Sequence, residues 1–232
     1  GYSRFKKIMI YSKIRFAFLV LFLSVSGMAK AQEDAGLWTS LTLQHKFTQK
    51  WSGAIGEQFR LWDNMSRIDQ YFTDLSLEYN ITKRFKASLN YRLISKNKET
   101  YYSKRHRFYL DLAYKYKISP VTLSLRERVQ EQLTDINSSE LGKIPEWYSR
   151  TKLTAKIDLN KKYSPYLATE VFYLIDNAKE KDEGIDRFRY EAGVDYEFNL
   201  HHSINVFYLI QHSLVSPAND YIIGLGYTFT SF

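Results

Sequence analysis

The sequence contains no cysteine. A disulfide framework, a thiolate metal site and a thiol nucleophile are therefore excluded. Attachment of a lipid to a cysteine after export is excluded for the same reason. Long apolar runs are also missing after residue 31. Because a spanning helix needs about 20 consecutive apolar residues, the sequence does not encode a helical membrane protein.

Acidic residues are absent from the first 31 positions, which hold six basic residues. The whole chain has a formal net charge of +8, but residues 32–232 hold 27 basic residues against 25 acidic ones. Most of the positive balance therefore belongs to the N-terminal segment. Since a nucleic-acid interface needs basic residues gathered on the folded part of a protein, nucleic-acid binding is not expected.

The N-terminal segment has the three parts of a secretory signal peptide. The basic stretch "RFKKIMIYSKIR" is followed by the apolar stretch "FAFLVLFLSVSG" and by Ala29-Lys30-Ala31, which has the A-x-A form of a cleavage site. The apolar part has about 12 residues and is too short to span a bilayer. We expect residues 1–31 to be a cleaved signal peptide and residues 32–232 to be the exported protein.

Apolar and polar residues alternate along nearly the whole of residues 32–232, as in β-strands with two different faces. In "RFRYEAGVDYEF", every second residue from Phe188 to Phe198 is apolar, and the residues between them are charged or glycine. The alternating segments are about 11 to 13 residues long. This length exceeds the roughly 5–6 residues of strands in globular sheets and suits a strand that crosses a bilayer. Eleven such segments are expected at about 36–47, 51–62, 69–80, 85–95, 105–116, 121–133, 147–158, 165–175, 187–198, 202–213 and 220–232.

The connections between these segments alternate in length. Short ones such as "ITKR" and "NLH" take turns with longer ones such as "SKNKETYYSK" and "TDINSSELGKIPE". This pattern predicts a closed antiparallel up-and-down transmembrane β-barrel of 10–12 strands, with short periplasmic turns and longer extracellular loops. Eleven strands would be an odd number, which leaves open a missed strand, an over-split strand, or residues 32–36 threading the lumen. A soluble periplasmic β-sandwich is the alternative fold.

Aromatic residues gather at the ends of the predicted strands. An amphipathic ring is most stable at the level of the lipid headgroups, so the pattern predicts an interfacial girdle at each end of the barrel and outer-membrane lipid as its surroundings. The last residue is Phe232, and a terminal aromatic resembles the signal that barrel assembly machinery binds. The predicted girdle residues are Trp51, Tyr79 and Tyr116 near the short turns, and Trp62, Trp147 and Tyr173 near the long loops.

The polar faces of the strands carry charges of both signs. A charge that leaves water must be paired, so we expect arginines opposite carboxylates to form a network that largely fills the narrow lumen. A narrow water-filled pore, in which the arginines favour anions, is the alternative. The predicted lumen-lining residues are Arg60, Asp74, Glu78, Arg92, Arg107, Asp111, Arg126, Arg128, Arg150, Lys152, Glu170, Arg187, Arg189, Glu191, Asp195 and Glu197.

Three carboxylates, Glu57, Glu127 and Glu131, fall at the positions of their strands that would face lipid. Glu57 would be costly at mid-depth, so we expect a β-bulge near Gly53 or Gly56, or a contact with a membrane-protein partner. Glu127 and Glu131 are expected near the loop end of their strand, above the bilayer.

No motif for catalysis is present. A lipid hydrolase would need a serine and a histidine oriented by a third group, and His106 and His212, near the long-loop ends, belong to no such motif. The neighbours His201 and His202 point apart on a strand and do not suggest a metal site. We therefore expect no enzyme, no catalytic residue, no metal and no cofactor, and keep an outer-membrane lipid-modifying enzyme as the alternative.

The chain resembles the uncharacterised outer-membrane barrels called domain of unknown function 2490. The similar stretches are "GLWTSLTLQHKF", "EQFRLW", "RTKLTAKI", "PYLATEVFY" and "YEAGVDYEFNLHHSINVFYLIQ". The resemblance implies a barrel fold and an outer-membrane location, and it supplies no activity. From the sequence we expect a structural or accessory barrel, or a narrow pore, in the cell outer membrane.

Overall fold

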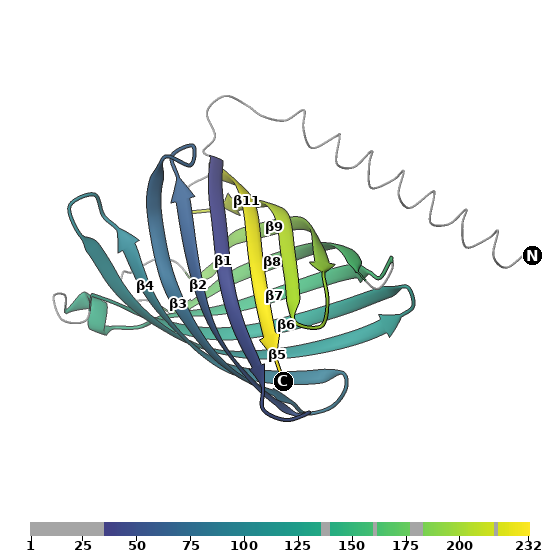
Figure 1. Cartoon of the computed structure of the whole chain (residues 1–232). Helices are drawn as coiled ribbons and strands as arrows, with labels where there is room; N and C mark the ends of the chain where they lie inside the picture. The colour runs from purple at the N-terminus through teal and green to yellow at the C-terminus, as the bar shows by residue number, and fades with distance from the viewer. Residues whose placement is uncertain (1–34, 136–139, 160–161, 177–182, 216–217) are drawn as a thin grey trace, which may run out of the picture. The chain divides into compact units, whose positions relative to one another are not determined.

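The computed structural model describes residues 35–135, 140–159, 162–176, 183–215 and 218–232, and the predicted signal peptide lies outside them. Within these ranges eleven strands close into one barrel (Figure 1). No helix in the described ranges is long and apolar enough to cross a membrane. The elements are β1 (Ala35–Lys46), β2 (Trp51–Trp62), β3 (Arg67–Asn80), β4 (Phe85–Asn97), β5 (Tyr102–Ile118), β6 (Val121–Thr134), the short 3-10 helix η1 (Leu141–Lys143), β7 (Glu146–Ile157), β8 (Tyr163–Asp176), β9 (Gly184–Glu197), β10 (His202–Ser213) and β11 (Ala218–Ser231).

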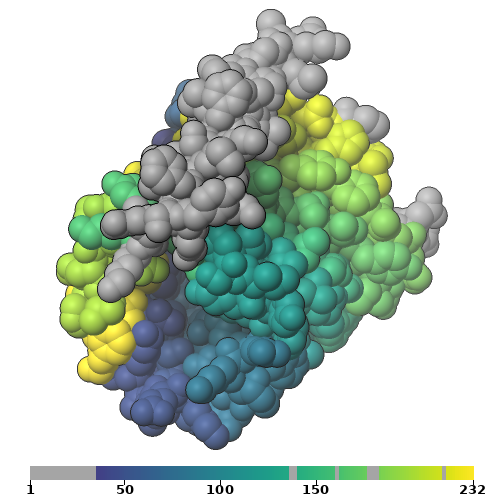
Figure 2. Space-filling model, turned by 90° about the vertical axis from the view of Figure 1, so that its right-hand side faces the viewer, coloured from purple at the N-terminus to yellow at the C-terminus, as the bar shows by residue number. Residues whose placement is uncertain are grey.

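Each strand pairs in antiparallel fashion with its neighbours along the chain, and β1 also pairs with β11 in parallel. An odd number of up-and-down strands leaves the first and last strands running in the same direction, so only a parallel pair can close the barrel. The predicted barrel is confirmed, with one parallel pair that was not predicted. Ala35 and Gly36 pair with Tyr221 and Ile222 and do not thread the lumen. Figure 2 shows β1 (purple) beside β11 (yellow) on the outer surface.

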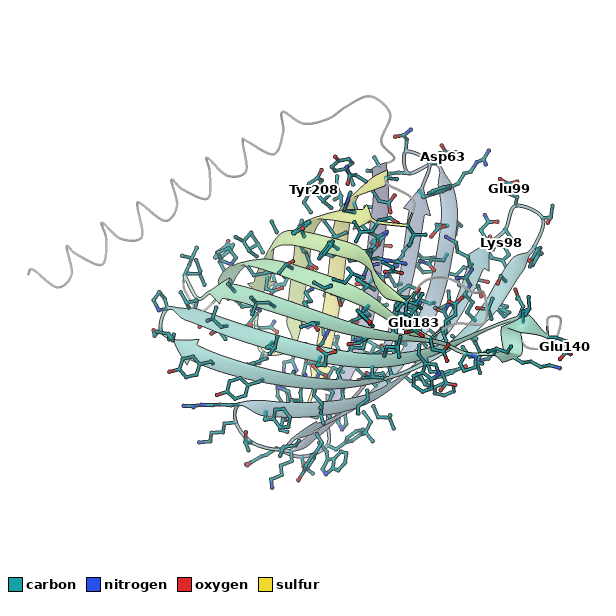
Figure 3. All side chains as sticks on the ribbon, turned by 180° about the vertical axis from the view of Figure 1, so that it is seen from behind. Asp63, Lys98, Glu99, Glu140, Glu183 and Tyr208 are labelled. Carbon is teal, nitrogen blue, oxygen red and sulfur yellow. The ribbon has the colours of Figure 1, made fainter. Side chains whose placement is uncertain are left out.

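The loops at one end are shorter than the sequence suggests. Residues 98–101 alone connect β4 to β5, because the pairs Asn97 with Tyr102 and Ser95 with Lys104 extend both strands into the predicted loop. The longer connections at this end join β6 to β7, where η1 lies, and β8 to β9. The prediction of longer loops at this end therefore holds for two connections and fails for that between β4 and β5. Figure 3 labels residues of four connections at this end, Asp63, Lys98, Glu99, Glu140 and Glu183.

The outer face of the barrel is apolar. Leu41, Leu75, Leu89 and Leu110 are exposed although they lie in the middle of strands, and polar residues alternate with them on the inner face. Such a face is stable only against hydrocarbon or another apolar surface. The rings predicted for the girdles lie at strand ends, with Trp51, Tyr79 and Tyr116 near the short turns and Trp62, Trp147 and Tyr173 at the other end.

The inner wall beside the parallel pair is apolar rather than charged. Trp38 of β1 packs edge-on against Phe207 of β10, with ring centroids 6.5 Å apart. The Phe207 ring covers Gly224 of β11, where an added Cβ would lie 2.0 Å from a ring atom. The glycine therefore gives this ring the room that it needs to pack against the wall.

Gly224→Ala tests this packing. The new Cβ would overlap the Phe207 ring and should lower the free energy of unfolding by about 1–3 kcal/mol, measured by urea denaturation of the barrel in lipid vesicles. Gly226→Ala is the matched control, because the nearest atom to its new Cβ would be the movable Ser40 hydroxyl at 3.0 Å, with Asn205 Cβ at an ordinary contact distance of 3.8 Å. An equal loss for the two variants would contradict the packing.

Candidate functional site

A cavity of about 640 Å³ lies inside the barrel, and residues from all eleven strands line it. These residues belong to the strand halves near the connections at 63–66, 98–101 and 135–145, so the cavity occupies that half of the lumen. Basic side chains predominate in the lining, with nine arginines and two lysines against five carboxylates. The arginines are Arg60, Arg92, Arg105, Arg107, Arg126, Arg128, Arg150, Arg187 and Arg189.

Glu170 of β8 is the carboxylate around which three of these arginines gather. Arg150 donates to Glu170 Oε1 from Nη2 at 2.8 Å and from Nε at 3.1 Å. Arg126 forms an ion pair with the same oxygen, and Arg189 Nη1 lies 3.8 Å from Oε2. Glu170 is only 4% exposed, so one buried negative charge is shared by three cations.

Three other arginines have a carboxylate of their own, and one of these, Arg187, pairs with its chain neighbour Asp186. Arg92 donates to both carboxylate oxygens of Asp74, and Arg128 does the same with Asp111, at 2.6–2.7 Å. This two-point geometry matches the planar guanidinium to the carboxylate and fixes both side chains. Tyr109 adds a hydroxyl hydrogen bond to Asp74 at 3.0 Å, and the Arg128 guanidinium lies over its ring.

Three arginines of the cavity have no carboxylate partner in the part of the chain that the structure describes. Arg60 donates to the amide oxygen of Gln58 at 3.2 Å and stacks 3.6 Å above the ring of Trp38. Arg107 donates to the amide oxygen of Gln132. The third is Arg105, and its buried Nε atom, like that of Arg60, finds no hydrogen-bond partner among the described atoms. Gln58 and Gln132 orient Arg60 and Arg107, and no carboxylate among the described residues pairs with any of the three guanidiniums.

A different network lies on the inner face of the barrel toward the short turns. Tyr166 donates its hydroxyl to Glu191 at 2.6 Å and accepts a hydrogen bond from Asn205 at 3.1 Å. Lys152 pairs with the same glutamate, whereas Asn205 also donates to Asp195. The Tyr166 ring lies against Gly193 of β9, where a Cβ would lie 2.7 Å from it. The network joins four neighbouring strands and forms a polar floor beneath the cavity.

Most of the predicted lumen residues line the cavity or pair with residues that line it, and the others lie toward the short turns. Eleven of the sixteen line the cavity, and Asp74 and Asp111 pair with two of its arginines. Glu78 pairs with Lys86 and Asp195 with Lys156 toward the short turns, whereas Glu197 is exposed at the end of β9.

Sequence reasoning missed several residues of the cavity. Arg105 and Trp38 follow the alternation of their strands and could have been found from it. Asp69 could not, because a register shift opposite Arg60 and Leu61 turns it toward Lys96, with which it pairs. A similar shift in β9 buries Asp186.

Two of the outward carboxylates, Glu57 and Glu127, accept hydrogen bonds from neighbouring hydroxyls. Glu57 accepts a hydrogen bond from Thr73 at 2.6 Å, and the pairing of β2 with β3 is regular from Trp51 to Arg60. The predicted bulge near Gly53 or Gly56 is therefore wrong. Glu127 accepts hydrogen bonds from Ser149 and Thr151 and lies near the middle of β6, so its predicted position near the loop end is wrong as well.

The histidines considered for catalysis make local contacts. His106 Nδ1 bonds to the Tyr91 hydroxyl at 2.8 Å, and His212 Nδ1 lies 2.9 Å from the Asn219 side-chain oxygen. His45 Nδ1 lies 2.8 Å from the Ser231 hydroxyl, at an exposed site where β1 and β11 end together. These contacts join neighbouring strands.

Glu170→Gln should destabilise the barrel strongly. It leaves Arg126, Arg150 and Arg189 without their common carboxylate, and removing one partner of a buried ion pair costs about 3–5 kcal/mol. The free energy of unfolding in lipid vesicles measures the loss. Glu78→Gln serves as the control, since the Glu78–Lys86 pair is more exposed. Similar losses for the two variants would rule out the central role of Glu170.

Several solved barrels are similar to the chain over most of its length. The NanC porin matches with a TM-score of 0.48 and 9% identity over 76% of this chain and 85% of its own. The KdgM porin in complex with disordered oligogalacturonate matches with a TM-score of 0.48 and 11% identity, over 79% of this chain and 87% of its own. LpxR from Salmonella typhimurium matches with a TM-score of 0.49 and 9% identity, over 78% of this chain and 83% of its own. A search of curated proteins finds no match. Residues 35–221 match the family described as "Protein of unknown function (DUF2490)", and the chain belongs to this family.

Proposed function

We propose that this protein is an integral barrel of the outer membrane that acts as a narrow pore for small anions. The outer-membrane location is supported by the apolar outward face, by strands of 12 to 17 residues and by closure of the sheet. A closed barrel satisfies every backbone hydrogen bond within itself, which is the condition for strands in hydrocarbon.

The arginine-rich cavity is the observation that carries the anion preference. Its lining holds eleven cations against five carboxylates, and Asp74, Asp111 and Asp186 outside the lining pair with three of its arginines, which leaves three cations in excess. Basic side chains that line a pore of low dielectric favour anions over cations. A lumen that served only as a structural plug would need balanced pairs, since an uncompensated buried charge is costly. The cavity departs from that balance, whereas toward the short turns lysines and carboxylates pair one to one, as Lys86 with Glu78 and Lys156 with Asp195.

The floor formed by Tyr166, Glu191, Lys152, Asn205 and Asp195 is the constriction in this proposal. Its groups are joined by hydrogen bonds of 2.6–3.1 Å, so an ion that crosses must separate some of them. We therefore expect a small conductance. A closed structural or accessory barrel is the second candidate, and this same closely bonded floor is the observation that favours it.

We propose that the barrel is not an enzyme. The hydrogen bonds of His106 and His212 to tyrosine and asparagine support this proposal, because neither provides the pairing with serine that a lipid hydrolase uses. A lipid-modifying barrel would lose turnover of labelled lipid when either histidine is replaced.

Conductance across a planar bilayer tests the pore. In a KCl gradient the reversal potential should show a preference for chloride, because the arginines raise the concentration of anions inside the cavity. The variant Arg60→Gln/Arg105→Gln/Arg107→Gln should lose most of this preference. Lys50→Gln/Lys83→Gln is the control, since both lysines lie in exposed short turns. A silent insertion of the folded barrel would overturn the pore in favour of the closed barrel.

Tyr166→Ala should raise the single-channel conductance, because it removes the ring that occupies the floor and releases Glu191 and Asn205. Tyr166→Phe keeps the ring and should change conductance much less. Equal conductance in the wild type and in Tyr166→Ala would place the constriction elsewhere in the lumen.

A further inference from the structure

We infer that the cavity contains a binding site for a compact organic anion with two or three carboxylate or phosphate groups, centred on Arg60, Arg105 and Arg107 and facing Trp38. This inference rests on the proposed pore, for which it names the class of solute. Four features of the cavity support it: its charge balance, the unused donors of the three arginines, the crowding of like charges and the apolar wall next to Arg60.

The cavity has a definite surplus of positive charge. Its lining holds eleven cations and five carboxylates, and Asp74, Asp111 and Asp186 outside the lining pair with three of its arginines. Eleven cations against eight carboxylates leaves three positive charges in excess. A ligand with two or three negative charges would compensate most or all of this surplus, whereas a monoanion would leave two of the three positive charges uncompensated.

The three central arginines keep donors free for a ligand. Neutral amide oxygens of Gln58 and Gln132 orient Arg60 and Arg107 without cancelling their charge. The buried Nε atoms of Arg60 and Arg105 have no hydrogen-bond partner among the described atoms. Arg105 and Arg107 are two residues apart on the same face of β5, so their side chains leave the strand roughly 7 Å apart. Two acid groups on one small molecule can bridge such a spacing.

Cross-strand neighbours crowd the positive charges further. Arg92 lies directly opposite Arg107 in the pairing of β4 with β5, and Arg128 lies directly opposite Arg150 in that of β6 with β7. Like charges directly opposite each other destabilise a sheet. Arg92, Arg128 and Arg150 each pair with a carboxylate, so the repulsion that remains falls mainly on Arg107, and a bound polyanion would offset it.

The part of the cavity wall next to Arg60, which stacks on Trp38, is apolar and suits an organic body. Trp38, Phe207, Leu209 and Ile222 line the same cavity from β1, β10 and β11. A guanidinium recognises carboxylate and phosphate equally through its two parallel donors, so this wall distinguishes an organic acid from an inorganic one. The cavity of about 640 Å³ lies within the usual size of small-molecule sites.

Isothermal titration of the full barrel in detergent micelles tests the site with defined probes. Benzene-1,3,5-tricarboxylate represents the carboxylates, fructose 1,6-bisphosphate the phosphates, and benzoate and inorganic pyrophosphate are the comparisons. We expect saturable binding of at least one organic polyanion, more tightly than benzoate and pyrophosphate. Arg60→Gln/Arg107→Gln should weaken it about tenfold or more, since each guanidinium makes charge-assisted hydrogen bonds. Lys50→Gln/Lys83→Gln removes the same charge in exposed turns and should leave binding unchanged.

Unfolding provides a readout that does not depend on comparing binding constants. Arg60→Gln/Arg107→Gln removes two crowded cations and should unfold at the same or a higher urea concentration than the wild type. The bound polyanion should raise the urea midpoint of the wild type and not that of the variant. A variant much less stable than the wild type would show that these arginines serve the fold, and the inference would fail.

The outcomes separate the site from the pore. Chloride-selective conductance with no saturable binding of either organic polyanion would overturn the site and keep the pore. Saturable binding that depends on Arg60 and Arg107, in a barrel without conductance, would keep the site and overturn the pore. Equal binding to the wild type and to Arg60→Gln/Arg107→Gln, or tighter binding of pyrophosphate than of both organic probes, would also overturn the inference.

Discussion

The parallel pairing of β1 with β11 is the constraint on which the rest of the barrel depends. Without it, the edges of both strands would present unpaired backbone groups to hydrocarbon, where each unsatisfied group costs several kcal/mol. Closure also fixes the two faces. Once the sheet is a closed ring, the alternation along each strand divides the side chains into an apolar outer set and a polar inner set. The cavity is a consequence of this division.

The two halves of the barrel interior bury charged side chains in different ways. Toward the short turns, lysines and carboxylates pair closely, as in Lys156 with Asp195 and Lys86 with Glu78. In the other half, one buried carboxylate, Glu170, serves three arginines, and glutamine amides hold two more. The first arrangement is what stability alone favours. The second keeps cations in excess, and such a departure from balance is expected where a protein binds something.

The sequence was sufficient for the barrel, its strand positions and most of its inner face, because period-2 alternation over a dozen residues is typical of a two-faced strand and does not suit a helix. It was insufficient wherever the alternation breaks. Asp69 and Asp186 lie at register shifts that no local pattern marks, and both turn inward to basic partners. The unequal sharing of Glu170 was also out of reach, since Arg126 reaches it from β6, a strand that does not neighbour β8. Parity predicts which face a residue occupies, and it does not predict its partner.

The closing pair also has a kinetic consequence. All other strand pairs join neighbours along the chain, whereas the contact of His45 with Ser231 joins residues 186 positions apart. The entropy lost in closing a loop grows with its length, and contacts of high sequence separation form late and slowly. The hairpins can therefore assemble one after another, but the lumen does not exist until β11 meets β1. Arginines on opposite sides of the closing pair, such as Arg60 and Arg189 near Trp38, come together only at this final step, so ions in the surrounding solution can influence how fast the barrel closes.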